Sequence, residues 1–316
     1  MPLTVLRCGQ FRGVMNLRKI ILFAILSSTM AEAHGAASSL FDRNDSSDSR
    51  SPWRASFFNL STMPVKGPEQ GAAQLFTYNY FSFDYKLDFN RKYSIRPVFF
   101  YETSGYDSFG TYKSPKATMG DAYVQYIDYG LAFLPGEVNL AGQFRVHLPT
   151  SQQSKEINQI ARFEGVFTFE KLLGRTTSLS YEVRPNYYWQ SQTNYLRTWT
   201  YVGGDRDGEL TGRVYQTKEY KIEHALEVEK KWNKYIGNAL SIGMTHEGYN
   251  DSKVENVESR HTDEINVGAS VIADISHKFN FIASIQNNVP LHSSKRDAKF
   301  LRSDEMEYVL LTFFRF

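Results

Sequence analysis

Residues 308–316 close the chain with the sequence Tyr-Val-Leu-Leu-Thr-Phe-Phe-Arg-Phe. Side chains on a β-strand alternate between its two faces, so positions two apart share a face. One face of this segment carries Tyr308, Leu310, Phe314 and Phe316, and only Thr312 interrupts it. A soluble domain rarely ends in such a strand, because an exposed apolar edge promotes aggregation. A closed membrane barrel removes that edge by pairing the last strand with the first.

This ending resembles that of the bacterial outer-membrane β-barrel superfamily, whose last strand usually ends in Phe with apolar residues at alternate positions before it. The resemblance implies an integral protein surrounded by outer-membrane lipid. It also implies that periplasmic chaperones and the barrel-assembly machinery handle the chain, and that the alternating apolar residues of the last strand are the signal this machinery reads. Thr312 and Arg315 depart from the pattern of the family.

The start of the chain has the order of features found in a secretory signal peptide. Arg18 and Lys19 precede the apolar run 20–26, and the small-x-small sequence Ala31-Glu32-Ala33 follows. The run is shorter than the roughly 20 residues of a transmembrane helix. We therefore predict a signal peptide over residues 1–33, with Met15 rather than Met1 as the natural start.

The mature chain should begin near His34, with a disordered lead-in over residues 34–52 that is rich in Ser, Asp and Arg. Cleavage would remove four of the 36 basic and one of the 34 acidic residues, which leaves a formal charge of −1. The mature chain thus offers no charge argument for binding nucleic acid. The single cysteine, Cys8, is lost as well, so neither a disulfide framework nor a thiolate metal site is expected.

From residue 53 onward, the chain is a series of alternating runs, most clearly 137–148, 177–190, 217–230 and 261–275. Short and long connections alternate between the runs. Tight turns are expected at 90–92, 171–174, 233–235 and 276–278, and a slightly longer turn at 130–136. The long polar connections are expected at 62–74, 104–118, 149–157, 191–216, 248–260 and 290–304. This asymmetry is typical of outer-membrane barrels, whose periplasmic turns are short and whose outer loops are long.

The sequence therefore predicts an all-β fold: a transmembrane, antiparallel, up-and-down β-barrel of about twelve strands over residues 53–316, with both termini in the periplasm. Ten or fourteen strands are the alternatives. Fourteen would require 191–216 to cross the membrane, whereas we expect this segment to be a hairpin that continues outward and turns at 203–208. The first strand, near 53–61, alternates poorly.

Charged residues at alternate positions are expected to line the lumen. The candidates for setting solute selectivity are Arg96, Arg145, Arg162, Arg184, Glu102, Glu164, Glu182, Glu219, Glu223 and Glu227. The arginines could form a track for anionic solutes. Alternatively, the mixed signs could be ion pairs that hold the shape of the barrel.

Histidines near the outer ends of two consecutive strands suggest a second kind of site. His246 with Glu247, and His261 with Asp263, could each orient and activate a nucleophile. His224 is expected to face lipid, but no partner Ser is evident for a lipid-cleaving site.

The favoured function is passive diffusion of small hydrophilic solutes, charged ones included, through an outer-membrane channel, with no cofactor, no metal and no nucleic-acid partner. The alternatives are an enzyme at the outer rim (a protease or a lipid hydrolase) and a closed structural or adhesive barrel. The sequence leaves the oligomeric state open.

Overall fold

The structure is a computed structural model of the chain. It describes residues 51–65, 75–106, 112–200, 210–251, 261–276, 278–291 and 306–316. The predicted signal peptide and nearly all of the predicted lead-in lie outside these ranges. The described part is almost entirely β-structure, with one short helix, α3 (Gln152–Glu156).

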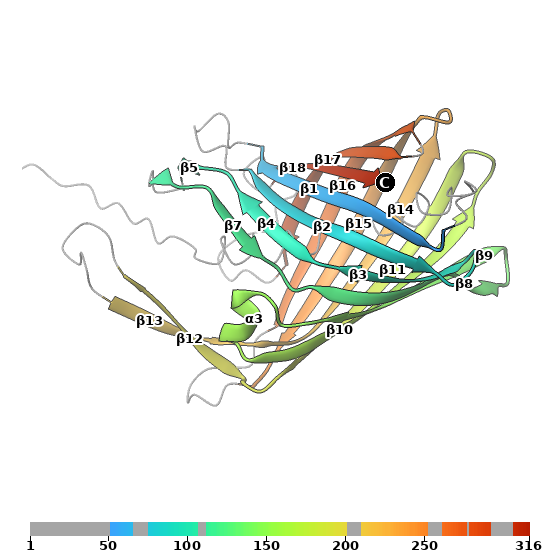
Figure 1. Cartoon of the computed structure of the whole chain (residues 1–316). Helices are drawn as coiled ribbons and strands as arrows, with labels where there is room; N and C mark the ends of the chain where they lie inside the picture. Colours follow the sequence, from blue (N-terminus) through green and yellow to red (C-terminus); the bar gives the residue numbers. More distant parts are fainter. Residues whose placement is uncertain are drawn as a thin grey trace, which may run out of the picture.

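Twelve antiparallel strands close into a barrel, with β3 and β4 counted as one strand and β7 and β8 as another. The bounds are β1 Trp53–Pro64, β2 Phe76–Lys86, β3 Arg91–Arg96, β4 Val98–Glu102, β7 Lys116–Met119, β8 Tyr123–Leu134, β9 Val138–His147, β10 Gln159–Leu172, β11 Thr177–Gln190, β14 Lys218–Lys231, β15 Ile236–Tyr249, β16 His261–Ser276, β17 Phe279–Pro290 and β18 Met306–Arg315. Because β1 pairs with both β2 and β18, the sheet closes on itself (Figure 1). The predicted fold class and strand number are confirmed.

The connections differ in length at the two ends of the barrel. Residues 87–90, 135–137, 173–176 and 232–235 make short turns at one end, which we call the short-turn end. At the other, the long-loop end, β12 (Asn194–Thr200) pairs only with β13 (Leu210–Gln216), and β5 (Gly105–Tyr106) only with β6 (Tyr112–Lys113). Figure 1 shows the β12–β13 hairpin projecting away from the barrel. The outward hairpin is therefore confirmed and the fourteen-strand alternative is wrong, while the predicted tip at 203–208 lies outside the described residues.

Two strands are interrupted for local reasons. Pro97 separates β3 from β4, because proline has no backbone N–H to donate to the sheet. Gly120 lies between β7 and β8, where a Cβ atom would be only 2.5 Å from Cγ1 of Val98 and 2.9 Å from Cε2 of Phe100. Because any larger residue would collide with these two side chains, the backbone at position 120 can approach β4 this closely only as glycine.

The turn between β2 and β3 shows how a short connection is stabilised. The carboxylate of Asp88 accepts hydrogen bonds from the backbone N–H groups of Asn90 and Arg91, both at 2.9 Å. Nε of Arg91 also donates to it at 2.6 Å, and this hydrogen bond holds the pKa of the exposed Asp88 carboxyl below its ordinary value. The carboxylate of Asp88 thereby accepts hydrogen bonds from backbone N–H groups that have no partner strand in the turn.

The outward face of the barrel is apolar across its middle and carries aromatic residues near the short-turn end. Exposed aromatic side chains at this end include Trp53, Tyr85, Tyr93, Trp232 and Tyr235. Trp232 donates its indole N–H to Asn238 at 2.6 Å. Such a belt is typical of the boundary between hydrocarbon and water in membrane barrels.

The weak alternation of the first strand has a structural reason. Asn59 and Ser61 of β1 lie on the face opposite the buried Phe58 and Leu60. Asn59 donates to Asn79 of β2 at 2.7 Å and accepts from Ser61 at 3.0 Å. Side-chain hydrogen bonding of this kind satisfies polar groups that would otherwise be costly on an outward face.

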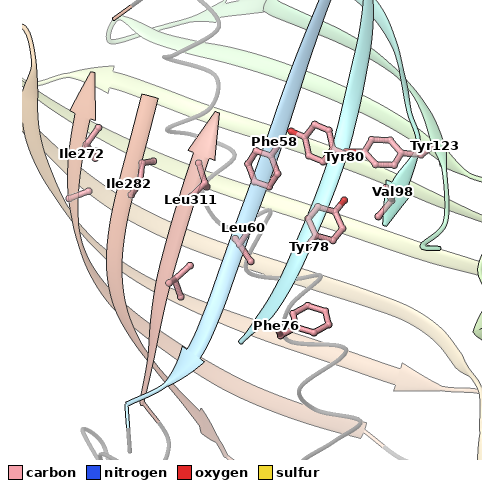
Figure 2. Close-up of a cluster of buried hydrophobic side chains, with 12 residues drawn as sticks. Phe58, Leu60, Phe76, Tyr78, Tyr80, Val98, Tyr123, Ile272, Ile282 and Leu311 are labelled. Atoms are coloured by element: carbon pink, nitrogen blue, oxygen red, sulfur yellow. The ribbon is translucent and has the colours of Figure 1, made fainter. Parts of the chain in front are cut away.

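Part of the inner wall is apolar, as Figure 2 shows. The cluster comprises Phe58, Leu60, Phe76, Tyr78, Tyr80, Val98, Tyr123, Ala239, Ile272, Ile282, Val309 and Leu311. The rings of Phe58 and Tyr80 stack with centroids 4.6 Å apart. Burial of each large apolar side chain contributes about 1.5–3 kcal/mol. The inner faces of β1, β2 and β18 are thus largely apolar at this place, so the charged side chains expected in the lumen line only part of the inner wall.

Candidate functional site: the charged inner wall

The inner wall formed by β9, β10, β11 and β14 is charged. Alternation places Arg145, Glu164, Glu182, Arg184 and Glu223 on it, and the side chains of the first four are almost completely buried. These five were predicted as lumen residues, and the cross-strand registers bring them together.

Glu164 is the centre of this wall. Arg145, which is its direct partner in the β9–β10 register, donates from Nη1 to Oε1 at 2.7 Å. Nε2 of His147 lies 2.8 Å from Oε2. The nearest guanidinium nitrogens of Arg162 and Arg184 lie 3.8 Å from the carboxylate. A single buried carboxylate therefore holds three arginines and a histidine.

The contacts of His147 with Glu164 and Arg162 together determine which of its nitrogens carries the hydrogen. Nη2 of Arg162 lies 2.8 Å from Nδ1 of His147 and 3.0 Å from Nε2. Because the carboxylate of Glu164 only accepts and lies against Nε2, we assign the hydrogen to Nε2, which leaves Nδ1 to accept from the guanidinium. Sequence reasoning missed His147, although it lies two residues after Arg145 and thus on the same face.

Arg184 connects the Glu164 cluster to β14. It donates to Glu182 at 2.5 Å, and its Nη1 lies 3.8 Å from Glu223. Glu223 in turn pairs with Lys221 at 2.8 Å. Sequence reasoning also missed Lys221 as a partner.

Arg96 lies apart from these ion pairs, beside the apolar wall. Its guanidinium is 4.6 Å from the ring centroid of Tyr80 and 5.8 Å from that of Tyr123. It donates to the hydroxyls of Ser82 at 3.0 Å and Tyr123 at 3.3 Å. These cation–π contacts add to the nearby charge of Asp84, whose carboxylate accepts a hydrogen bond from the same Ser82 hydroxyl at 2.5 Å.

Two further predicted residues, Glu102 and Glu219, also lie outside the cluster. Glu102 is half-buried on β4, opposite Lys116 of β7 in the register. Glu219 is exposed, because a bulge at Lys218–Tyr220 breaks the alternation of β14. Lys218 instead reaches Glu247 of β15 at 2.5 Å.

Toward the short-turn end, the inner wall becomes acidic. Glu227 and Glu229 are buried, and within the described part of the chain neither has an ion-pair or hydrogen-bond partner. Buried polar atoms of Gln125, Asn266 and Asn288 on the inner wall also lack partners among these residues. Polar groups buried in this way are stable only when water hydrates them.

The histidines of the second predicted site are paired differently from the expectation. Neighbouring residues on a strand face opposite sides, so Glu247 points inward while His246 points outward. Nδ1 of His246 lies 2.6 Å from Oδ1 of Asp263, its partner in the β15–β16 register. The proposed pairs His246–Glu247 and His261–Asp263 are therefore wrong. His261 is exposed, with no partner among the described residues.

No group of three or more His, Cys, Asp or Glu side chains in the described ranges is arranged to hold a metal ion. Within the same ranges, no helix has the length and apolar character needed to cross a membrane.

Comparison with known proteins finds similarity of fold. No protein-family model matches the chain, and no curated protein matches it. Among solved structures, it is similar to the COG4313 outer membrane channel from Pseudomonas putida F1, with 9% identity and a TM-score of 0.52, over 86% of this chain and 98% of that one. It is also similar to the NanC porin, with 10% identity and a TM-score of 0.40, over 83% of this chain and 100% of that one. At 9% identity the likeness to the first of these structures concerns the fold alone, a closed antiparallel β-barrel.

Proposed function

We propose that the protein is an integral outer-membrane channel through which small hydrophilic solutes diffuse passively. The short-turn end, with both ends of the barrel sheet, would face the periplasm, and the long-loop end the exterior. The apolar outward face and the aromatic belt support placement in a bilayer. Similarity to solved outer-membrane barrels supports the choice of membrane.

The observation that carries the proposal is the pair of unpartnered carboxylates, Glu227 and Glu229. An ionised carboxylate without a partner is unfavourable in a dry interior, so these side chains favour a water-filled lumen. Charges that line a hydrated lumen set its ion selectivity.

The distribution of partners determines the expected sign of that selectivity. Arg145 and Arg184 are held by carboxylates, whereas Glu227 has no cationic neighbour among the described residues and Glu229 has only Lys231 near it, without an ion pair. The uncompensated charge on this wall is therefore negative. We infer that the lumen prefers cations to anions, which is the opposite of the arginine track for anionic solutes considered from the sequence.

Single-channel recording in planar bilayers tests both points. The refolded protein should conduct in steps of stable size, and a salt gradient should give a reversal potential of the sign expected for cation preference. The double variant Glu227→Gln, Glu229→Gln should lose most of this preference while its steps remain. Glu219→Gln, the same change at an exposed position of the same strand, should leave the reversal potential unchanged. A folded barrel that never conducts would contradict the proposal.

A further inference from the structure

The outward wall of the barrel carries an array of polar side chains across four neighbouring strands. Tyr181 on β11, His224 on β14, His246 on β15 and Asp263 on β16 all face away from the lumen. The hydroxyl of Tyr181 lies 2.9 Å from Nδ1 of His224. The rings of His224 and His246 have centroids 5.8 Å apart and are nearly perpendicular. Ionisable groups on a lipid-facing wall are costly and are candidates for function.

The partners of the two imidazoles give them complementary roles. Nδ1 of His246 donates to the carboxylate of Asp263 at 2.6 Å, which leaves Nε2 as a base. The hydroxyl of Tyr181 can donate to Nδ1 of His224 or accept from it, and in the tautomer in which it donates, Nε2 of His224 carries the hydrogen. Neither Nε2 atom has a hydrogen-bond partner in the described part of the chain. In this tautomer, the array presents a proton acceptor beside a hydrogen-bond donor.

The outward residues of β16 indicate how deep the array lies in the bilayer. From Ile265 to Ile275 they are all apolar, and Asp263 is the next outward residue toward the long-loop end. Ten residues at about 3.3 Å each, on a strand tilted by about 40°, span about 25 Å, which is the height of the apolar band of such barrels. Asp263 and His246 therefore lie at the edge of the hydrocarbon, where the ester bonds of lipids are found.

We propose that this array hydrolyses acyl esters of the lipids that surround the barrel. Nε2 of His246 removes a proton from water as the water oxygen bonds to the carbonyl carbon. The resulting oxyanion accepts a hydrogen bond from Nε2 of His224. The bond between this carbon and the ester oxygen then breaks, and the leaving alkoxide takes the proton back from His246. The products are a fatty acid and a lysolipid, with water as the only co-reactant.

In this scheme, His246 and His224 are catalytic residues, while Asp263 and Tyr181 position them. Asp263 also stabilises the imidazolium that forms on His246. The proposal shares with the channel function only the placement of the barrel in a membrane.

The test uses the refolded full chain in mixed micelles of detergent and phosphatidylethanolamine, with released fatty acid and lysolipid measured by mass spectrometry. The wild type should release both in equal amounts. His246→Asn should reduce the rate by about 100-fold or more, which is the lower range for a general base. His224→Phe should reduce it by about 100-fold as the loss of an oxyanion donor. His261→Asn, a histidine at the same rim but outside the array, should release lipid products as the wild type does.

The positioning roles are tested by readouts that a purely structural role would not change. Asp263→Asn should lower the rate and shift the pH at which activity rises, while Asp263→Glu should restore part of it. Tyr181→Phe should lower the rate without unfolding the barrel, as judged by its mobility on gels before and after heating.

Wild-type protein that releases no more fatty acid than protein-free micelles would overturn the proposal, as would a His246→Asn variant of undiminished rate. Bilayer recordings of His246→Asn should match the wild type, so failure of the channel and failure of the hydrolase are distinguishable.

Discussion

Glu164→Gln should lower the free energy of unfolding by about 3 kcal/mol, the cost typical of breaking a buried ion pair from one side. The substitution removes the charge that Arg145 and His147 contact at 2.7 and 2.8 Å and that Arg184 approaches. The two guanidiniums would then remain buried near each other without their shared carboxylate. The midpoint of urea unfolding in lipid vesicles, followed by tryptophan fluorescence, measures the effect.

Two further variants make the result specific. Glu156→Gln makes the same change at an exposed position of α3 and should leave the midpoint unchanged. Arg145→Met combined with Glu164→Leu removes both members of the shortest pair and should recover part of the loss, because apolar replacements of buried pairs are often well tolerated. A Glu164→Gln variant with the urea midpoint of the wild type would show that the network does not stabilise the barrel.

Phe316→Ser should remove most of the folded protein from the outer membrane of expressing cells while leaving the refolded barrel nearly as stable as the wild type. The side chain of Phe316 is 74% exposed, and the backbone N–H that donates to Ala55 at 3.0 Å is retained in the variant. Exposed substitutions typically change stability by less than about 0.5 kcal/mol. The resemblance to outer-membrane barrels implies that a receptor in the cell reads this aromatic end.

Phe89→Ser is the matched control, because Phe89 is 75% exposed in a turn at the same end of the barrel. It should reach the outer membrane in wild-type amounts, measured by fractionation and by gel mobility before and after heating. Equal assembly of the Phe316→Ser variant would mean that the terminal aromatic is not the assembly signal.

Much of the fold could be predicted from local pattern. In 138–147 the period of two is unbroken, and the order of short and long connections gave both the strand number and the projecting hairpin at 191–216. The pattern failed where both faces of a strand are apolar. In β18 the inward Val309 and Leu311 alternate with the outward Leu310, so hydropathy alone cannot distinguish the two sides.

For the candidate sites, the sequence predicted on which side of the barrel wall each side chain lies, but not which other side chains it contacts. Alternation put Arg145, Glu164 and Arg184 on the inner wall without any knowledge of neighbouring strands. Partners depend on register, which the turns and bulges of each hairpin set. His246 and Asp263 meet because β15 and β16 align them, whereas adjacency in the sequence suggested Glu247 and His261. Glu219 was placed inward because the sequence does not mark the bulge beside it.

The pairing of β1 with β18, which closes the barrel, also determines how the protein unfolds. In an open sheet, an edge strand can detach by breaking one row of hydrogen bonds, but every strand of this barrel is bonded on both sides. The first step of unfolding must therefore break two rows at once, which raises the activation barrier. We expect folded protein to persist in unheated detergent for long periods, with its half-life rather than an equilibrium constant deciding how long it survives in a cell envelope.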